Sequence, residues 1–285
     1  MIKNLTNLRA DDSPLFGGKA ASLGEVSSIG IPIPRGIAIS IQAYRHHVFV
    51  VGGDKLLRQF WDDPDTDRSE DLSDALSKRL IKFPPLALSV AVLRNFNVSC
   101  IRELMVRSSA TVEDSRAASF AGLFFSRPSK PLRRELALAV CEVWLSASSP
   151  HVKSYTKKIL NNGFTTIDMA VVVQERIKCS TSGLFFTKHP TVSIPGWGLL
   201  EFADAEPEAL VGGNVRPTMW RVNLSDHRFA IERDGEFPHS LSPSHFAQLI
   251  GYGAQLRQHF GCHVDIEWGI GTHGIVIFQC RPVTA

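Results

Sequence analysis

Residues 264–283 read VDIEWGIGTHGIVIFQCRPV, two runs of alternating polar and apolar residues separated by a turn between two glycines. The alternation predicts two strands, because successive side chains of a strand point to opposite faces. The short turn predicts that these strands form an antiparallel hairpin. Gly274 supplies the left-handed residue that a three-residue loop needs near its end. This hairpin is the clearest structural signal in the chain.

The loop length sets which side chains meet across the hairpin. A three-residue loop over 272–274 places Glu267 opposite Gln279 and Asp265 opposite Arg281, all on one face. A two-residue loop would separate these pairs. The opposite face is expected to be apolar, with Ile266, Trp268, Phe278 and Cys280. Carboxylate oxygens are ligands that Mg²⁺ prefers, and arginine binds phosphate oxygens. The pattern alone leaves two alternatives open, a metal and phosphate site or a solvated strand face with a cross-strand ion pair.

The segments before the hairpin mix helical and strand patterns. Helices are predicted over residues 17–30 and 135–147, and strands over 33–40, 169–177 and 182–190. Residues 62–74 are acidic and polar, which favours a surface loop or the start of a helix. The mixture of elements predicts an α+β or α/β protein.

Composition excludes several classes of protein. The chain has 285 residues, 44% of them hydrophobic, and a formal net charge of +3, with its basic residues scattered. A nucleic-acid-binding protein would usually concentrate its basic residues on one face, so no nucleic-acid partner is expected. Five cysteines, an odd number without a CxxC pair, indicate a reducing cytosol. The N-terminus has no apolar signal core, and no stretch approaches the ~18 apolar residues of a membrane helix. We expect a soluble cytoplasmic protein with no membrane partner.

The common catalytic motifs are absent. The ten histidines show neither HExxH nor a Cys/His spacing typical of zinc sites, and GxSxG does not occur. Gly17-Gly18-Lys19 precedes a predicted helix, where backbone N–H groups and a lysine can hold a phosphate. Ala20 follows the lysine, so this is no P-loop, and a plain turn with a surface lysine is the alternative. The hydroxyl-rich segments 107–111 and 119–122 either wrap phosphates or are ordinary loops.

Eight segments taken in order resemble the nucleotide-binding domain of the phosphoenolpyruvate synthase and pyruvate phosphate dikinase family, a variant of the ATP-grasp fold. They read GGKAASLGEV, IPIPRGIAIS, VRSSATVEDSRAASFAG, VVVQERI, GLFFTKHP, EALVGGNVRP, VDIEW and FQCRPVT. The resemblance implies an α+β, two-lobed ATP-grasp fold with the nucleotide in the cleft between the lobes. Residues 1–175 would form the N-terminal lobe, and residues 176–285 the C-terminal lobe that carries the metal and phosphate hairpin.

The resemblance also implies roles for individual residues. Lys19, Arg107 and Arg281 would grip the phosphates of ATP and act in catalysis. Mg²⁺ would be held by Asp265, Glu267 and Gln279. The residues implied to bind the nucleotide are Lys19, Arg107, Ser119, Gly122, Gln174, Glu175, Ile177, Glu267, Gln279 and Arg281. Within this set, the strand over 173–177 would line the adenine pocket and the segment 119–122 would close over the nucleotide.

Two departures from the family pattern stand out. The family commonly has Gly-Leu-Gly-Glu before a Val-x-Gly, whereas residues 205–208 read AEPE, which keeps the acid Glu208 without the glycines. Family members also continue beyond the RPVT segment into a phosphohistidine domain and a third domain.

The resemblance therefore implies an MgATP-dependent phosphotransferase. It would transfer a phosphoryl or pyrophosphoryl group to a histidine on a separate partner protein or to a small-molecule acceptor. The alternatives are a carboxylate–amine ligase acting through an acyl phosphate and a non-catalytic ATP-binding regulatory or scaffold protein.

Overall fold

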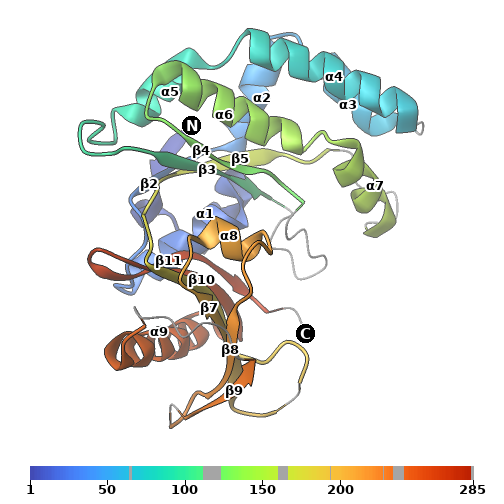
Figure 1. Ribbon diagram of the computed structural model, residues 1–285. Coiled ribbons are helices and arrows are strands. Elements are labelled where there is room, and N and C mark those ends of the chain that lie inside the picture. Colours follow the sequence, from blue (N-terminus) through green and yellow to red (C-terminus); the bar gives the residue numbers. More distant parts are fainter. Residues whose placement is uncertain are drawn as a thin grey trace. The chain divides into compact units, whose positions relative to one another are not determined.

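The computed structural model describes residues 1–63, 66–111, 123–159, 166–192, 194–226, 228–233 and 241–283. The chain divides into two units (Figure 1). Unit 1 comprises Met1–Gly24 and Arg35–Arg176, and unit 2 comprises Glu25–Pro34 and Ile177–Ala285. Each unit has an antiparallel sheet with helices, which confirms the α+β class. The lobes 1–175 and 176–285 stay a prediction; the units divide after Arg176, and residues 25–34 join unit 2.

Unit 1 contains a five-stranded sheet. Its strands, in spatial order, are β1 (Ile2–Asn4), β2 (Gly36–Ile39), β5 (Met169–Glu175), β3 (Leu104–Ala110) and β4 (Ser126–Ser129). β5 lies at the centre, as its run of β-branched residues predicts. Arg107 pairs with Val172 and Met105 with Gln174, so these four side chains share one face. The other face carries the apolar residues of the core.

Nine helical segments of the described residues begin in unit 1. They are η1 (Leu5–Asn7), η2 (Ala10–Asp12), α1 (Ser13–Ser28), α2 (Ile41–Val50), α3 (Asp54–Asp62), α4 (Thr66–Lys82), α5 (Leu86–Leu93), α6 (Arg133–Ser146) and α7 (Pro150–Ile159). Figure 1 shows α5 and α6 over one side of the sheet. Leu136, Val140, Val143 and Trp144 of α6 recur at helical spacing and are buried in the core. Burial of each such side chain stabilises the fold by ~1.5–3 kcal/mol.

Unit 2 contains a six-stranded sheet. Its strands, in spatial order, are β11 (Gly274–Pro282), β10 (Val264–Gly271), β6 (Thr181–Phe186), β7 (Trp197–Ala203), β8 (Thr218–Asn223) and β9 (Phe229–Arg233). The helices are α8 (Pro207–Val211) and α9 (Pro243–Phe260). Figure 1 shows α9 along one side of this sheet, where Leu249 and Leu256 join a core with Ile266 and Trp268. Side chains that alternate with Ile266, Asp265 among them, therefore face away from α9.

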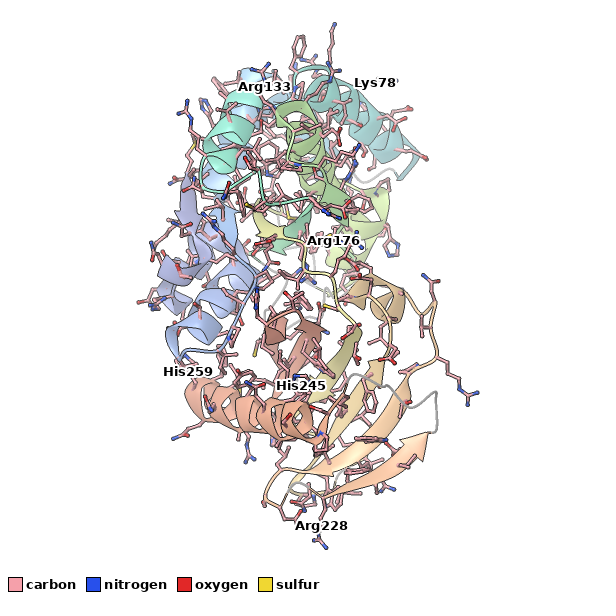
Figure 2. All side chains as sticks on the ribbon, turned by 60° about the vertical axis from the view of Figure 1, so that its left-hand side comes forward. Lys78, Arg133, Arg176, Arg228, His245 and His259 are labelled. Carbon is pink, nitrogen blue, oxygen red and sulfur yellow. The ribbon has the colours of Figure 1, made fainter. Side chains whose placement is uncertain are left out.

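Among the described residues, none of the helices has the length and apolar character needed to cross a bilayer. Side chains cover both units in Figure 2, which places Lys78, Arg133 and Arg228 among those at the surface.

Candidate functional site

β10 and β11 form the predicted hairpin, but its turn is shorter than expected. Gly271 pairs with Gly274, so the loop consists of residues 272–273 and the three-residue loop was a wrong expectation. Gly274 has a φ of 107°, as a glycine at a tight turn can. With this turn, an uninterrupted ladder would pair Glu267 with Phe278 and turn the predicted partners to opposite faces.

A β-bulge at Phe278 restores the predicted register. The ladder shifts by one residue between Trp268 and Glu267. As a result, Glu267 pairs with Gln279 and Asp265 pairs with Arg281. The extra residue lies in the strand rather than in the loop, and both arrangements give the same two pairs. The four predicted side chains are therefore brought together on one face of two neighbouring strands.

The bulge also moves Phe278 to an unexpected face. A Cβ added to Gly269 would lie 2.8 Å from Phe278 Cε2 and 2.5 Å from Cys179 Sγ. Gly269 shares its face with Glu267, since two residues separate them along β10. The prediction that Phe278 lies on the apolar face was therefore wrong, because a bulged residue breaks the alternation of a strand.

Asp265 is buried, and described side chains satisfy only half of its carboxylate. Arg281 Nε donates to Asp265 Oδ2 at 2.7 Å. The other oxygen, Oδ1, is buried and has no hydrogen-bond partner among the described residues. Burial raises the pKa of Asp265, an effect that the adjacent Arg281 opposes and Glu267 reinforces. A buried carboxylate oxygen without a donor is a group that a cation would satisfy.

Glu267 and Gln279 complete the oxygen-bearing face. Gln279 is buried and Glu267 is half-buried. They form the pair next to Asp265–Arg281 on the same face of the hairpin. Their side-chain oxygens and Asp265 Oδ1 are hard donors from two acids and an amide, which is a donor set that fits Mg²⁺. Arg281 adds a guanidinium suited to a phosphate.

The hairpin's turn end is apolar. A Cβ added to Gly271 would lie 2.8 Å from Ile177 Cγ2, so Ile177 packs on the strand face that Gly269 and Glu267 also occupy. Ser180 N donates to Ile270 O at 3.0 Å and fixes the segment that follows Ile177 to β10. Apolar groups and oxygen ligands thus lie at opposite ends of one strand face.

In unit 1, a serine holds the start of the predicted phosphate-binding helix. α1 has a kink at Gly17, whose φ is 77°. Ser109 Oγ donates to Phe16 O at 2.8 Å and accepts from Ala20 N at 3.1 Å. This hydroxyl thus joins the two parts of α1 and caps the second part, in which Lys19 lies. No local sequence pattern around Ser109 predicts this role.

Arg107 and Gln174 lie on the same face of the unit 1 sheet as Ser109. Arg107 is two residues before Ser109 on β3, and Gln174 lies on the adjacent strand β5. Lys19 is buried, and Gln174 Nε2 is a buried donor without an acceptor among the described residues. Ser109 therefore ties the segment that carries Lys19 to the strand that carries Arg107.

The other predicted residues are placed differently. Glu175 pairs with Leu104, so its side chain lies on the sheet face opposite Gln174. Ser119 and Gly122 lie outside the described residues. The AEPE segment leads into α8, with Glu206 at the N-cap position and its Oε2 atom buried without a described partner.

Known proteins match this chain along almost its whole length. A family model described as pyruvate phosphate dikinase, AMP/ATP-binding domain, matches residues 13–285. The chain belongs to this family. The phosphoenolpyruvate synthase of Aeropyrum pernix is 27% identical, over 100% of this chain and 42% of that protein. A rifampicin phosphotransferase of Streptomyces sp is 26% identical, over 100% of this chain and 36% of that protein.

The chain thus spans less than half the length of these relatives. Among solved structures, the D-alanine–D-alanine ligase from Coxiella burnetii matches with a TM-score of 0.40 and 9% identity, covering 94% of this chain and 48% of that chain. The family membership confirms the resemblance that the sequence motifs predicted.

Proposed function

We propose that the chain binds MgATP and transfers a phosphoryl or pyrophosphoryl group from it. The observation that carries this proposal is Asp265 Oδ1, a buried carboxylate oxygen without a described partner, on one strand face with Glu267, Gln279 and Arg281. A solvated strand face would not bury such an atom, because an unsatisfied buried polar group costs ~1–3 kcal/mol. Membership in an AMP/ATP-binding domain family supports ATP as the ligand.

Asp265, Glu267 and Gln279 would hold Mg²⁺, which neutralises phosphate charge when bound. Arg281 would hold Asp265 in place through its Nε and direct the rest of its guanidinium to phosphate oxygens. Lys19 and Arg107 of unit 1 would add two further cationic groups for the same triphosphate. Phosphoryl transfer needs little covalent chemistry from a protein, so positioning and charge neutralisation would be the main contributions of these residues.

The nucleotide base would contact the apolar segment around Ile177 and the face of Gln174. Glu175 would contribute through its backbone, because its side chain lies on the sheet face opposite Gln174. We also propose the lobes 1–175 and 176–285 as the two ATP-grasp lobes. Ser119 and Gly122 remain candidates for closing over the nucleotide.

The acceptor would be a histidine on a separate partner protein or a small molecule. Relatives with this domain include proteins named for phosphoenolpyruvate synthesis and for rifampicin phosphorylation, so the family serves more than one acceptor. We further propose a cytoplasmic location, supported by five free cysteines.

The test is product analysis with the purified protein, Mg²⁺ and ATP, with and without candidate acceptors. We expect AMP or ADP to form, and Glu267→Gln to reduce the rate by at least about 100-fold because it removes a ligand charge. Glu70→Gln, at an exposed glutamate of α4, is the control and should leave the rate unchanged. Circular dichroism of each variant separates lost chemistry from lost folding.

Each outcome distinguishes among the alternatives. AMP formation supports a dikinase-like reaction and a phosphohistidine partner. ADP formation only with a carboxylic acid and an amine present would identify a ligase. ATP binding without turnover, with phosphohistidine-domain proteins of the family supplied as acceptors, would favour the regulatory alternative. Absence of ATP binding would overturn the proposal.

A further inference from the structure

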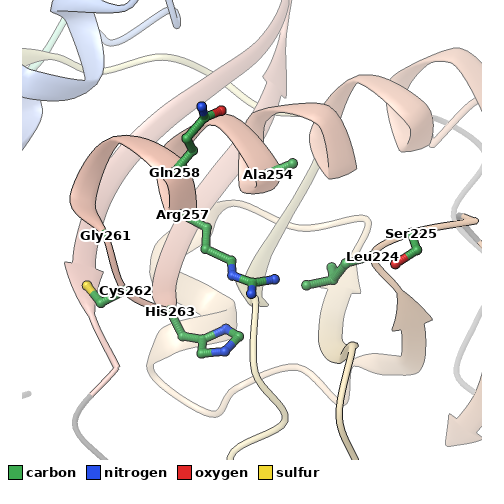
Figure 3. A pocket seen from close by; sticks show the side chains of 8 residues that line it. All are labelled: Leu224, Ser225, Ala254, Arg257, Gln258, Gly261, Cys262 and His263. Carbon is green, nitrogen blue, oxygen red and sulfur yellow. The ribbon is translucent and has the colours of Figure 1, made fainter.

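Unit 2 has a pocket of about 610 Å³ at the C-terminal end of α9 (Figure 3). Its lining residues are Leu224, Ser225, Ala254, Arg257, Gln258, Gly261, Cys262 and His263. The lining residues of α9 belong to the helix that covers the Ile266 side of the sheet, whereas Asp265 and Glu267 face the other side. This pocket is therefore distinct from the proposed metal and phosphate face.

The pocket has a positive electrostatic environment. Arg257 and His263 line it, and no lining residue is acidic. In Figure 3, Arg257 extends from α9 into the space between His263 and Leu224. Arg257 and Lys188 both act electrostatically on His263, so two cationic side chains lie near this histidine.

The nearest acid in sequence is already neutralised. Asp226 follows the lining residue Ser225, and its Oδ2 accepts from Arg228 Nε at 2.6 Å. The side chain of Arg257 makes no hydrogen bond or ion pair with the described residues, including the carbonyls of the last turn of α9. A basic residue near a helix C-terminus often interacts with those carbonyls. Arg257 instead points into the pocket, where its guanidinium is available to a ligand.

His263 presents one defined nitrogen to this space. Its Nδ1 lies 2.9 Å from Thr187 O, and since a carbonyl oxygen only accepts, Nδ1 carries the proton in this contact. Nε2 is then the nitrogen left for a ligand, and in the neutral ring it accepts a hydrogen bond from a ligand hydroxyl. The backbone of Thr187 therefore fixes which ring nitrogen is available to a ligand.

We propose that this pocket binds a small organic phosphate, with the phosphate on Arg257 and Ser225, a ligand hydroxyl on His263 Nε2 and the organic part against Leu224 and Ala254. A guanidinium pairs with phosphate oxygens through two parallel hydrogen bonds. No carboxylate lines the pocket to compete with the phosphate for Arg257. The volume is within the range of small-molecule sites, about 300–1,000 Å³, and exceeds what a bare phosphate needs. The site does not depend on the proposed ATP-binding residues.

The first test uses glucose 6-phosphate, inorganic phosphate and glucose as probes with the full chain. Cys262 lines the pocket and serves as a local reporter, read as the rate of its alkylation by iodoacetamide in the mass spectrum of its peptide. We expect glucose 6-phosphate to slow this alkylation, inorganic phosphate to slow it less, and glucose to have no effect. Because the readout is at Cys262, phosphate bound elsewhere does not mimic the result.

Variants give the second test. Arg257→Gln should raise the concentration of glucose 6-phosphate that halves the Cys262 alkylation rate by at least about 10-fold, since it removes the bidentate partner of the phosphate. Arg133→Gln, at an exposed arginine that begins α6 (Figure 2), is the matched control and should leave it unchanged. Absence of protection in the wild type, or equal protection in Arg257→Gln, would overturn the proposal.

A change at His263 supplies a third readout. His263→Asn should weaken the protection by glucose 6-phosphate at a fixed pH, because it removes a ring that lines the pocket beside Arg257. Equal protection in the wild type and in His263→Asn would exclude His263 from the site.

Discussion

At the scale of single residues, the contact between Gly17 and Ser109 sets the position of Lys19. Gly17 adopts a φ of 77°, and a Cβ added there would lie 1.8 Å from Ser109 O. No side chain can occupy that space, so the backbone of α1 approaches β3 closely only because residue 17 is glycine. The two hydrogen bonds of Ser109 Oγ then fix the helix at this distance.

Two glycines with similar backbone angles allow this idea to be tested. Gly30 has a φ of 81° and no atom within 4 Å of an added Cβ, whereas the Cβ at Gly17 would collide with Ser109. We expect Gly17→Ala to lower the free energy of unfolding by about 3 kcal/mol and Gly30→Ala by about 1 kcal/mol. Urea denaturation followed by circular dichroism measures both. Equal losses would show that the close approach to β3 contributes nothing beyond backbone strain.

The sequence predicts candidate phosphate-binding residues in this region but not the groups that hold them in place. Lys19 after two glycines and Arg107 in a hydroxyl-rich segment are residue types that suit phosphate, and their role stays a prediction. Ser109 was not given a role, because its partner Phe16 lies 93 residues away in the chain. Local patterns carry no information about a hydrogen bond formed only when distant segments pack.

At the scale of elements, the β10–β11 hairpin shows why pairing can be predicted although the loop is not. Glu267 pairs with Gln279 if the chain between them has one residue more than a regular ladder with a two-residue loop requires. The alternation pattern cannot show whether that residue belongs to the loop or to a bulge, since both restore the same register. The structure places it at Phe278, within the strand.

A double-mutant cycle tests the bulge and its surroundings. Gly269→Ala would place a Cβ 2.5 Å from Cys179 Sγ and 2.8 Å from Phe278 Cε2, so we expect it to destabilise the protein by about 2 kcal/mol. Cys179→Ala removes the nearer of these two atoms. The double variant should therefore recover at least about 0.5 kcal/mol relative to the sum of the single changes. Additive effects, measured by urea denaturation, would place Cys179 away from Gly269.

At the scale of the whole molecule, the two units are not two continuous stretches of chain. Residues 25–34 belong to unit 2, although residues before and after them belong to unit 1, and the division falls within α1. A sequence read from one end to the other predicts a single boundary, because a helical pattern continues through Gly24 without interruption. The α+β class follows from local patterns, whereas the division of the chain depends on long-range packing.

The proposed nucleotide-binding residues are divided between these units, and this gives the broadest prediction. A ligand that binds only the folded protein adds about 2.7 kcal/mol to the free energy of unfolding at one hundred times its Kd. We expect MgATP to raise the melting temperature, and both Lys19→Ala in unit 1 and Glu267→Gln in unit 2 to remove most of that increase. Lys78→Ala, at an exposed lysine of α4, should leave it unchanged.

The double variant Lys19→Ala/Glu267→Gln should show no further loss, because both side chains would act on one triphosphate. The comparison uses the increase caused by MgATP and not the melting temperature itself, since Lys19 is buried and its removal also affects folding. Omitting Mg²⁺ should reduce the increase in the wild type and have little effect in Glu267→Gln. If Lys19→Ala kept the full increase while Glu267→Gln lost it, nucleotide binding would rest on unit 2 alone, and the assignment of Lys19 to phosphate would fail.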